Sequence, residues 1–379
     1  MGSLNYPFTN AGFHLHYTYM SLTQDLQKLI RFKPITNDRA ATRRALSWLQ
    51  AQFRALGLHT TTWSSAGYQT LQAWTHSRNR PALLLAAHVD VVPGPARLFR
   101  PVVRQGKLYG RGAYDMLFAI ASYLEVLRQL RKKIPTLNLG VLITSDEEIG
   151  GDNGTAIAVK RGLKPKLVFL PDGGMNWNIE LAAKGVWHFR ATATGRAAHG
   201  AHLWDGDNAI TMLTTFLTKI LALVPKEPCG NKTHWHNSIN VGTIAGGNAT
   251  NSVPAVAVAT VDVRFTTQIA GRQLKQKILK LARAAKIQLE TISEGGAVAI
   301  SRQHPAVLTY ARVAKKHGVN ISTERSHGAS DAPYFADVKV PVLLVTPTGG
   351  NLHTDREWIN LRAAETYTKI LQDFILQAS

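Results

Sequence analysis

The chain has 379 residues, 45% of them hydrophobic, and a formal net charge of +20 at pH 7. This length exceeds what one hydrophobic core usually serves, so the sequence predicts two domains. The composition excludes a disordered chain, and the apolar runs have the length of strands rather than of membrane spans. The single cysteine, Cys229, excludes an intramolecular disulfide and a multi-thiolate zinc site. Its Pro- and Gly-flanked loop favours an ordinary thiol.

The basic residues are scattered along the chain rather than gathered in one patch. The densest runs are Arg128–Lys133 and Arg272–Lys286, and in the second one apolar side chains recur at helical spacing, so its charges are expected on the solvated face of a helix. We therefore expect no nucleic-acid or membrane partner, and the charge indicates either a basic proteome or a preference for an acidic substrate. Residues 1–19 are predicted to be an extension that lacks the features of a secretory signal, which indicates a cytoplasmic protein.

The first part of the chain alternates helical patterns with short apolar strands. The second helix is expected to be capped by Asn37 and to end before Gly57. The alternation predicts an α/β domain with a central, mostly parallel sheet and helices on both faces. The expected helices are Leu22–Phe32, Asp38–Leu56, Asp115–Lys132, Gly154–Arg161, Ala306–His317 and Leu361–Gln377, and the expected strands are 82–87, Leu137–Thr144, Leu167–Leu170 and Pro341–Val345.

The middle of the chain changes to a β-α-β-β-α-β order, which is typical of a ferredoxin-like α+β domain. Its expected strands are Val186–Thr194, Ser238–Gly246, Ala255–Phe265 and Ile287–Ser293, and its helices are Asn208–Leu223 and Arg272–Lys286. The sequence therefore predicts a first domain built from residues 20–183 and 295–379. A second domain, residues 184–294, is inserted into it.

Candidate metal ligands follow the apolar strands directly. His88 and Asp90 are two residues apart on extended chain, so their side chains leave on the same side. A metal-bound imidazole usually donates its other N–H to a carboxylate or carbonyl, which Asp90 could provide. Asp115 follows a glycine-rich turn in YGRGAYDM, where a carboxylate could bridge two ions or simply cap a helix.

Three further segments carry carboxylates or histidine at strand ends. In SDEE, Glu147 and Glu148 point in opposite directions on extended chain, so one could bind metal while the other moves protons. A solvated charge run is the alternative. Asp172 in PDGG and His353 in GNLHTD would each, taken alone, be ordinary loop residues.

The ordered set HVD, GRGAYDM, DEE, PDGG and LHTDREW resembles the M20 family of metallopeptidases and deacylases, from about residue 20 to the C-terminus. The resemblance implies two divalent ions, with zinc favoured and manganese or cobalt also suited to such ligands. It implies Glu147 as general base and Asp90 as the acid that orients a ligand histidine. The implied ligands are His88 and Asp172 for one ion, Glu148 and His353 for the other, and Asp115 between them.

The same resemblance makes the inserted domain a lid and dimerisation domain. His199 would reach the site of the partner subunit in a homodimer and polarise the scissile carbonyl. Asn251 and Arg264 would hold the substrate carboxylate, and Gly328 and Ser330 would face the same group.

Asp172 separates two hypotheses about the substrate. Deacylase members generally carry Glu at this place, whereas Asp is typical of aminopeptidase and dipeptidase members. The sequence therefore favours an exopeptidase or dipeptidase acting on short peptides with a free carboxylate. The alternative is an N-acyl-amino-acid deacylase such as a desuccinylase or deacetylase. A non-catalytic binding protein on the same scaffold is disfavoured, because Glu147 and every candidate ligand are present.

Overall fold

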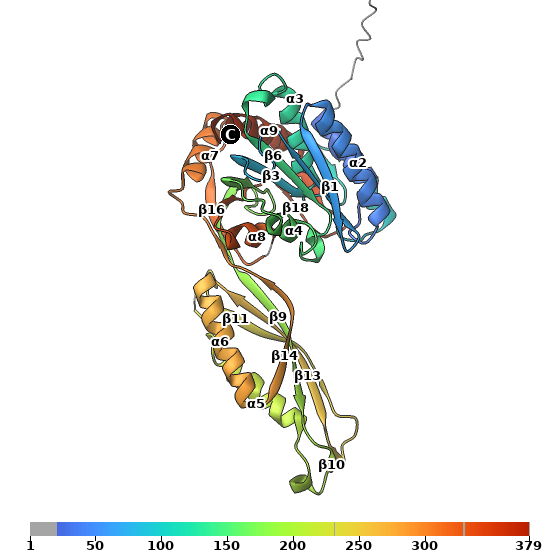
Figure 1. Cartoon of the computed structure of the whole chain (residues 1–379), viewed down its shortest axis with the longest axis vertical. Helices are drawn as coiled ribbons and strands as arrows, with labels where there is room; N and C mark the ends of the chain where they lie inside the picture. The colour runs from blue at the N-terminus through green and yellow to red at the C-terminus, as the bar shows by residue number, and fades with distance from the viewer. Residues whose placement is uncertain (1–20, 231, 329, 379) are drawn as a thin grey trace, which may run out of the picture.

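The computed structural model describes residues 21–230, 232–328 and 330–378; the expected extension, residues 1–19, lies outside this range. Figure 1 shows a rounded body that holds the C-terminus and an elongated second body that extends away from it. Strands β9 and β14 run from the rounded body into the elongated one, so the chain passes between them at this junction.

The rounded body is built on a six-stranded sheet with the order β1-β2-β6-β3-β7-β17. β3 pairs in parallel with β6 and β7, and β7 pairs in parallel with β17, whereas β1 and β2 form an antiparallel hairpin at one edge. Every residue of β3 and β6 is buried, so both faces of the sheet centre are covered. The strands are β1 His59–Ser65, β2 Tyr68–Trp74, β3 Leu83–His88, β6 Leu139–Thr144, β7 Leu167–Phe169 and β17 Val342–Leu343.

Helix α3 is the central helix of the rounded body, with α1 and α9 packed beside it and β3 beneath it. Its side chains are buried almost throughout, from Leu117 to Leu127. α2 packs against the β1–β2 hairpin. The helices are α1 Leu22–Arg31, α2 Arg39–Ala55, α3 Leu117–Gln129, α4 Thr155–Lys160, α7 Pro305–Lys316, α8 Ala332–Asp337 and α9 Leu361–Ala378. No helix in the described part of the chain is both long and apolar enough to span a membrane.

Two small sheets complete the rounded body and carry loops of the site. One has the order β18-β19-β5-β4 and the other the order β15-β8-β16. Their strands are β4 Val102–Arg104, β5 Lys107–Tyr109, β8 Asn178–Ala183, β15 Val298–Ala299, β16 Ser322–Ser326, β18 Gly349–Gly350 and β19 Trp358–Asn360.

The elongated body contains an antiparallel sheet with the order β11-β13-β9-β14, and α5 and α6 pack against it. Side chains of β13 alternate between buried and partly exposed, as expected for a sheet that is covered on one face. A short β10–β12 pair lies at the far tip (Figure 1). The elements are β9 Gly185–Thr194, β10 Ala198–His199, α5 Ala209–Leu221, β11 Ser238–Gly246, β12 Ser252–Val253, β13 Val256–Phe265, α6 Gln268–Ala284 and β14 Ile287–Gly295.

The structure corrects several local predictions. Asp38, not Asn37, caps α2, because its side chain accepts a hydrogen bond from the backbone N–H of Ala41 at 2.9 Å. Asn37 instead accepts a hydrogen bond from the hydroxyl of Tyr68. Helix α6 begins at Gln268, earlier than expected, with Thr267 as its cap. The β1–β2 hairpin was not predicted, because β1 is rich in Thr and Ser and has no apolar alternation.

Candidate metal centre

Three parallel strands end at the same edge of the large sheet, and each is followed by candidate ligands. β3 ends with His88, β6 leads into Asp146, Glu147 and Glu148, and β7 leads into Asp172. The carboxyl edge of parallel strands is where α/β proteins build their sites. The structure thus brings residues from distant parts of the sequence to one edge for a simple topological reason.

Two groups of potential ligand atoms form at this edge. His88, Glu147 and Asp172 each offer one atom within 4.8 Å of the others, and Asp115, Glu148 and His353 do the same. Asp115 lies between the groups. Its Oδ1 is 3.3 Å from Nε2 of His88 and its Oδ2 is 2.9 Å from Nε2 of His353.

The ligand atoms fit a bound cation. Among the described residues, Nε2 of His88, Oε1 of Glu148 and Oδ2 of Asp172 are buried without a hydrogen-bond partner. Buried polar atoms normally have partners, because an unpaired one costs free energy of desolvation. Divalent cations coordinate imidazole nitrogens and carboxylate oxygens, so a metal ion would satisfy all three atoms.

The charges of the site also favour a cation. Burial raises the pKa of Glu147 well above its ordinary value, and the charge of Asp172 raises it further. Burial likewise raises the pKa of Asp172. Hydrogen bonds with Asp115 and Glu148 raise the pKa of His353 to about 10. Carboxyl groups are therefore crowded in a poorly hydrated space, where a positive charge would stabilise their ionised forms.

The carboxylate triplet is not a solvated charge run. Asp146 is fully buried and accepts hydrogen bonds from the backbone N–H groups of Asn153 and Gly154, at 2.7 and 3.1 Å. It therefore holds the loop after β6, while Glu147 and Glu148 are left to face the ligand groups.

Asp90 contacts His88 differently from the expectation. Nδ1 of His88 lies 2.8 Å from the backbone oxygen of Asp90 and 3.6 Å from its carboxylate. The carboxylate instead accepts hydrogen bonds from Thr36 and from the backbone N–H groups of Glu147 and Glu148. Asp90 thus orients the imidazole through its main chain and fixes the Glu147–Glu148 backbone through its side chain.

Sequence reasoning missed a buried ion pair behind the site. Nη1 of Arg111 lies 3.0 Å from Oε2 of Glu357, and both side chains are almost fully buried. Glu357 accepts hydrogen bonds from three backbone N–H groups of the turn that carries Asp115, and Arg111 donates to the backbone oxygen of His353. Arg111 stands in the motif GRGAYDM and Glu357 in LHTDREW. Charged residues are usually exposed, so the sequence gave no sign that these two are buried.

A cavity of about 310 Å³ opens beside the ligand groups. Gly328 and Ser330 line it, and so does Glu180, which was not anticipated. Its other lining residues are Tyr114, Asp115, Pro171, Asp172, Gly173, Met175, Ser326, Thr346, Leu352 and His353.

The model of peptidase family M20/M25/M40 matches residues 84–377, which include all the candidate ligands. The chain belongs to this peptidase family. It is 28% identical over 374 residues to succinyl-diaminopimelate desuccinylase from a Caulobacter species, covering 92% of this chain and 94% of the relative. It is 26% identical over 374 residues to human aminoacylase-1, covering 86% of this chain and 89% of the relative.

A tripeptidase from Staphylococcus aureus shares the fold, with a TM-score of 0.76 at 19% identity over 94% of this chain and 97% of that one. The family match and these relatives make the chain an M20 peptidase or deacylase, and therefore an enzyme. The M20 family is metal-dependent, and the two ligand groups are this chain's candidates for holding metal.

Three further residues of this M20 chain lie away from its own ligand groups. His199 in β10 pairs with Ser252, next to Asn251, at the far tip of the elongated body (Figure 1). Arg264 lies near the opposite end of β13, where its Nε donates to Asp262 at 2.8 Å. The strand from Val256 to Arg264 spans roughly 26 Å at about 3.3 Å per residue. Asn251 and Arg264 therefore lie far apart within one chain, and their shared role at the substrate carboxylate stays a prediction.

Proposed function

We propose that this M20 enzyme is an exopeptidase or dipeptidase that cleaves short peptides with a free carboxylate. One observation carries the proposal: the cavity beside the ligand groups is small and has three carboxyl groups in its lining, those of Asp115, Asp172 and Glu180. Burial raises the pKa of Glu180 to about 8. A protonated α-amino group would stabilise the ionised form of this carboxyl, so the cavity suits a peptide with a free N-terminus.

His88 and Asp172 would hold one divalent ion, Glu148 and His353 the other, with Asp115 between them. We propose zinc, because mixed imidazole and carboxylate ligands suit it. Ions held there would act as Lewis acids, making water more acidic and polarising an amide carbonyl.

Glu147 would act as the general base. Burial raises the pKa of its carboxyl. A carboxylate with a raised pKa is a stronger base, and a general base works best when its pKa lies near the working pH. Glu147 would take a proton from the attacking water and deliver it to the leaving nitrogen as the C–N bond breaks. The products are a carboxylate and an amine, and Asp90 keeps the backbone of Glu147 in place throughout.

Residues 184–294 would form a lid that also joins two subunits. The position of His199 supports this, because the far tip of the lid cannot serve its own site without a large movement. Large apolar side chains are exposed on this body, including Trp204 at 76% and Ile244 of the edge strand β11 at 53%. Exposed apolar side chains and open strand edges are typical of contact surfaces. Asn251 and His199 would then come from the partner subunit, and Arg264 from the same chain as the metal site.

The second candidate is an N-acyl-amino-acid deacylase, which the names of the relatives from Caulobacter and human support. The two candidates differ in whether the substrate amino group is free or acylated. A deacylase substrate presents an amide where a dipeptide presents an ammonium group. Glu180 would therefore contribute to the binding of a dipeptide but not to that of an N-acyl amino acid.

A substrate panel tests the proposal. The metal-loaded enzyme should hydrolyse some unblocked dipeptides with higher kcat/KM than N-acetyl or N-succinyl amino acids, and E147Q should lose every true activity. E180Q should raise KM for unblocked dipeptides more than for N-acetylated ones. Cleavage of N-succinyl or N-acetyl substrates far better than every dipeptide would contradict the proposal and favour the deacylase.

A further inference from the structure

A third group of potential ligands lies outside the M20 site, in the loop between α5 and β11. Glu227, Cys229, His234 and His236 each offer one atom, and these atoms lie within 4.8 Å of one another. The sequence alone predicts an ordinary thiol at Cys229. The fold places this single thiol against two imidazoles and a carboxylate.

The distances within this loop cluster resemble those between the ligands of one ion. Sγ of Cys229 lies 3.1 Å from Nε2 of His236 and 3.4 Å from Nδ1 of His234. Oε2 of Glu227 lies 3.2 Å from Nδ1 of His234. In a tetrahedron with bonds of about 2.1 Å, neighbouring ligand atoms are about 3.4 Å apart. Only small adjustments would therefore centre the four atoms on a cation.

The hydrogen bonding of His236 prepares it as a ligand. Its Nδ1 lies 2.8 Å from the backbone oxygen of Asn237, which can only accept, so Nδ1 must carry the proton. In the neutral ring, Nε2 then presents its lone pair to the cluster. Metal-binding histidines are commonly oriented in this way by a carbonyl.

The chemistry of the set favours zinc-like ions over calcium or magnesium. Thiolate and imidazole are soft or borderline ligands, and one thiolate, two imidazoles and one carboxylate oxygen together make the four ligands of a closed tetrahedral structural site. One thiolate and one carboxylate would also neutralise a divalent charge. His234 has a left-handed backbone, with φ of 48°, and the backbone N–H of His236 donates to its backbone oxygen, so the two imidazoles are held in one tight turn.

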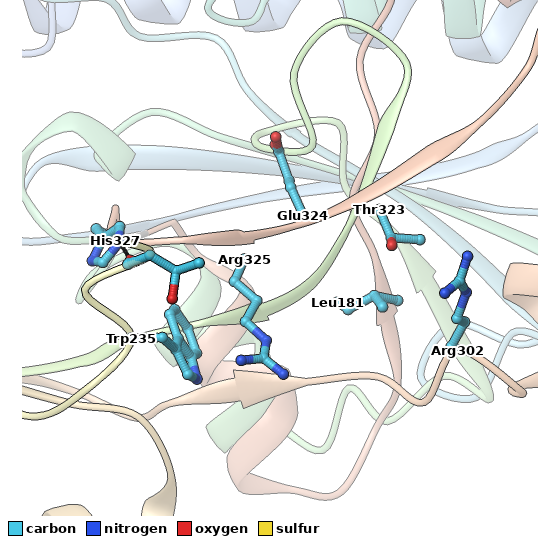
Figure 2. A pocket seen from close by; sticks show the side chains of 8 residues that line it. Leu181, Trp235, Arg302, Thr323, Glu324, Arg325 and His327 are labelled. Atoms are coloured by element: carbon cyan, nitrogen blue, oxygen red, sulfur yellow. Dashed lines mark hydrogen bonds between the residues drawn. The ribbon is translucent and has the colours of Figure 1, made fainter. Parts of the chain in front are cut away.

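The residues between the ligands attach the loop to the rounded body. The backbone oxygen of His234 accepts a hydrogen bond from Lys184, and Nε2 of His327 lies 3.2 Å from the backbone oxygen of Thr233. The ring of Trp235 packs edge-on against His327, and the guanidinium of Arg325 lies 5.4 Å from the centroid of the Trp235 ring. Figure 2 shows these three side chains beside one another. Lys184 immediately precedes β9, so these contacts lie where the two bodies meet.

We propose that Glu227, Cys229, His234 and His236 form a separate mononuclear site for a zinc-type divalent cation. The bound ion closes the loop between α5 and β11 and holds Thr233 and Trp235 against the junction of the two bodies. This site is structural, because all four positions are filled by protein ligands and none is left for substrate.

Cobalt(II) provides a test that does not depend on activity. Cys229 is the only cysteine of the chain, so a thiolate-to-cobalt charge-transfer band in the near ultraviolet can arise only at this site. We expect the metal-free full-length protein to develop this band on titration with Co²⁺. C229S should abolish the band and bind one ion fewer per chain. H236N should weaken binding at this site by about tenfold or more.

Two control variants separate this site from the M20 site. E148Q, which alters the M20 ligands, should keep the band, and H76N, which removes an exposed histidine outside every ligand group, should change nothing. Circular dichroism checks that each variant is folded. The absence of the band at saturating Co²⁺, or equal metal content in C229S and the parent protein, would overturn the proposal. If H236N develops the band with the same affinity for Co²⁺ as the parent protein, the proposal is also overturned, because the thiol would then bind cobalt without the cluster.

Discussion

Oδ2 of Asp115 lies 2.9 Å from Nε2 of His353, and the buried Arg111–Glu357 pair joins the turn of the first residue to the loop of the second. Glu357 accepts hydrogen bonds from the turn, and Arg111 donates to the loop. The distance between these two ligands is therefore set by residues that need not touch a metal or a substrate.

E357Q should weaken metal binding, because the amide removes the charge that pairs with Arg111 and can no longer accept every backbone N–H group of the turn. We expect a loss of about tenfold or more in metal affinity, as is usual when the partners of ligands are changed. Titration of the metal-free protein measures it, and excess metal should restore part of the activity. D355N is the matched control, because Asp355 lies in the same loop but forms only an exposed pair with Arg97. An equal loss in D355N would contradict the positioning role of Glu357.

E147Q should abolish turnover without removing metal. The amide keeps the size of the side chain but cannot take a proton, so the rate should fall by about 100-fold or more. Metal analysis and activity are measured on the same sample. The test is sharp because Glu147 lies within the same group of ligand atoms as His88 and Asp172. E148Q, by contrast, should lose metal, and loss of metal in E147Q instead would mean that the roles of the two residues are exchanged.

Strand ends and turn glycines made the candidate ligand groups predictable from the sequence. His88, Glu148 and Asp172 follow apolar strands, and the parallel pairing that carries them to one edge is a general rule of α/β sheets. Arg111 and Glu357 could not be predicted in the same way. Their pairing depends on β19 lying beside β5, a contact between distant segments that no local pattern encodes.

The loop cluster was missed for a related reason. A lone cysteine in a loop is usually an ordinary thiol, and the sequence shows neither the hydrogen bond that orients His236 nor the approach of Glu227. Glu180 was missed because a carboxylate in a short strand looks exposed until the cavity around it is known.

E180Q should change how stability depends on pH. Burial raises the pKa of Glu180 to about 8 from its ordinary 4.5, so the folded state keeps a proton that the unfolded state loses. The contribution of Glu180 is therefore fully present below about pH 4.5 and is lost as pH rises through about 8. Thermal melts between pH 5 and 9 should show the parent protein losing stability relative to E180Q as pH rises. A difference that does not vary with pH would mean that Glu180 is already ionised in the folded protein.

Mixing two inactive variants tests whether subunits share a site. E147Q lacks the base in its own site, and H199A lacks the histidine that its lid tip would offer to a partner. In a mixed dimer, the site in the H199A chain keeps Glu147 and receives His199 from the E147Q chain, so one of the two sites is complete. We expect partial activity to return after subunit exchange, up to about half that of the parent dimer per mixed pair. His202, which stacks on Trp204 beside the same tip, supplies a control, since H202A keeps both Glu147 and His199 and should not abolish activity. Formation of mixed dimers is checked with two different affinity tags. Mixed dimers that stay inactive would show that His199 does not complete the partner's site. This result would not bear on the metal ligands of each chain, which the metal titrations test separately.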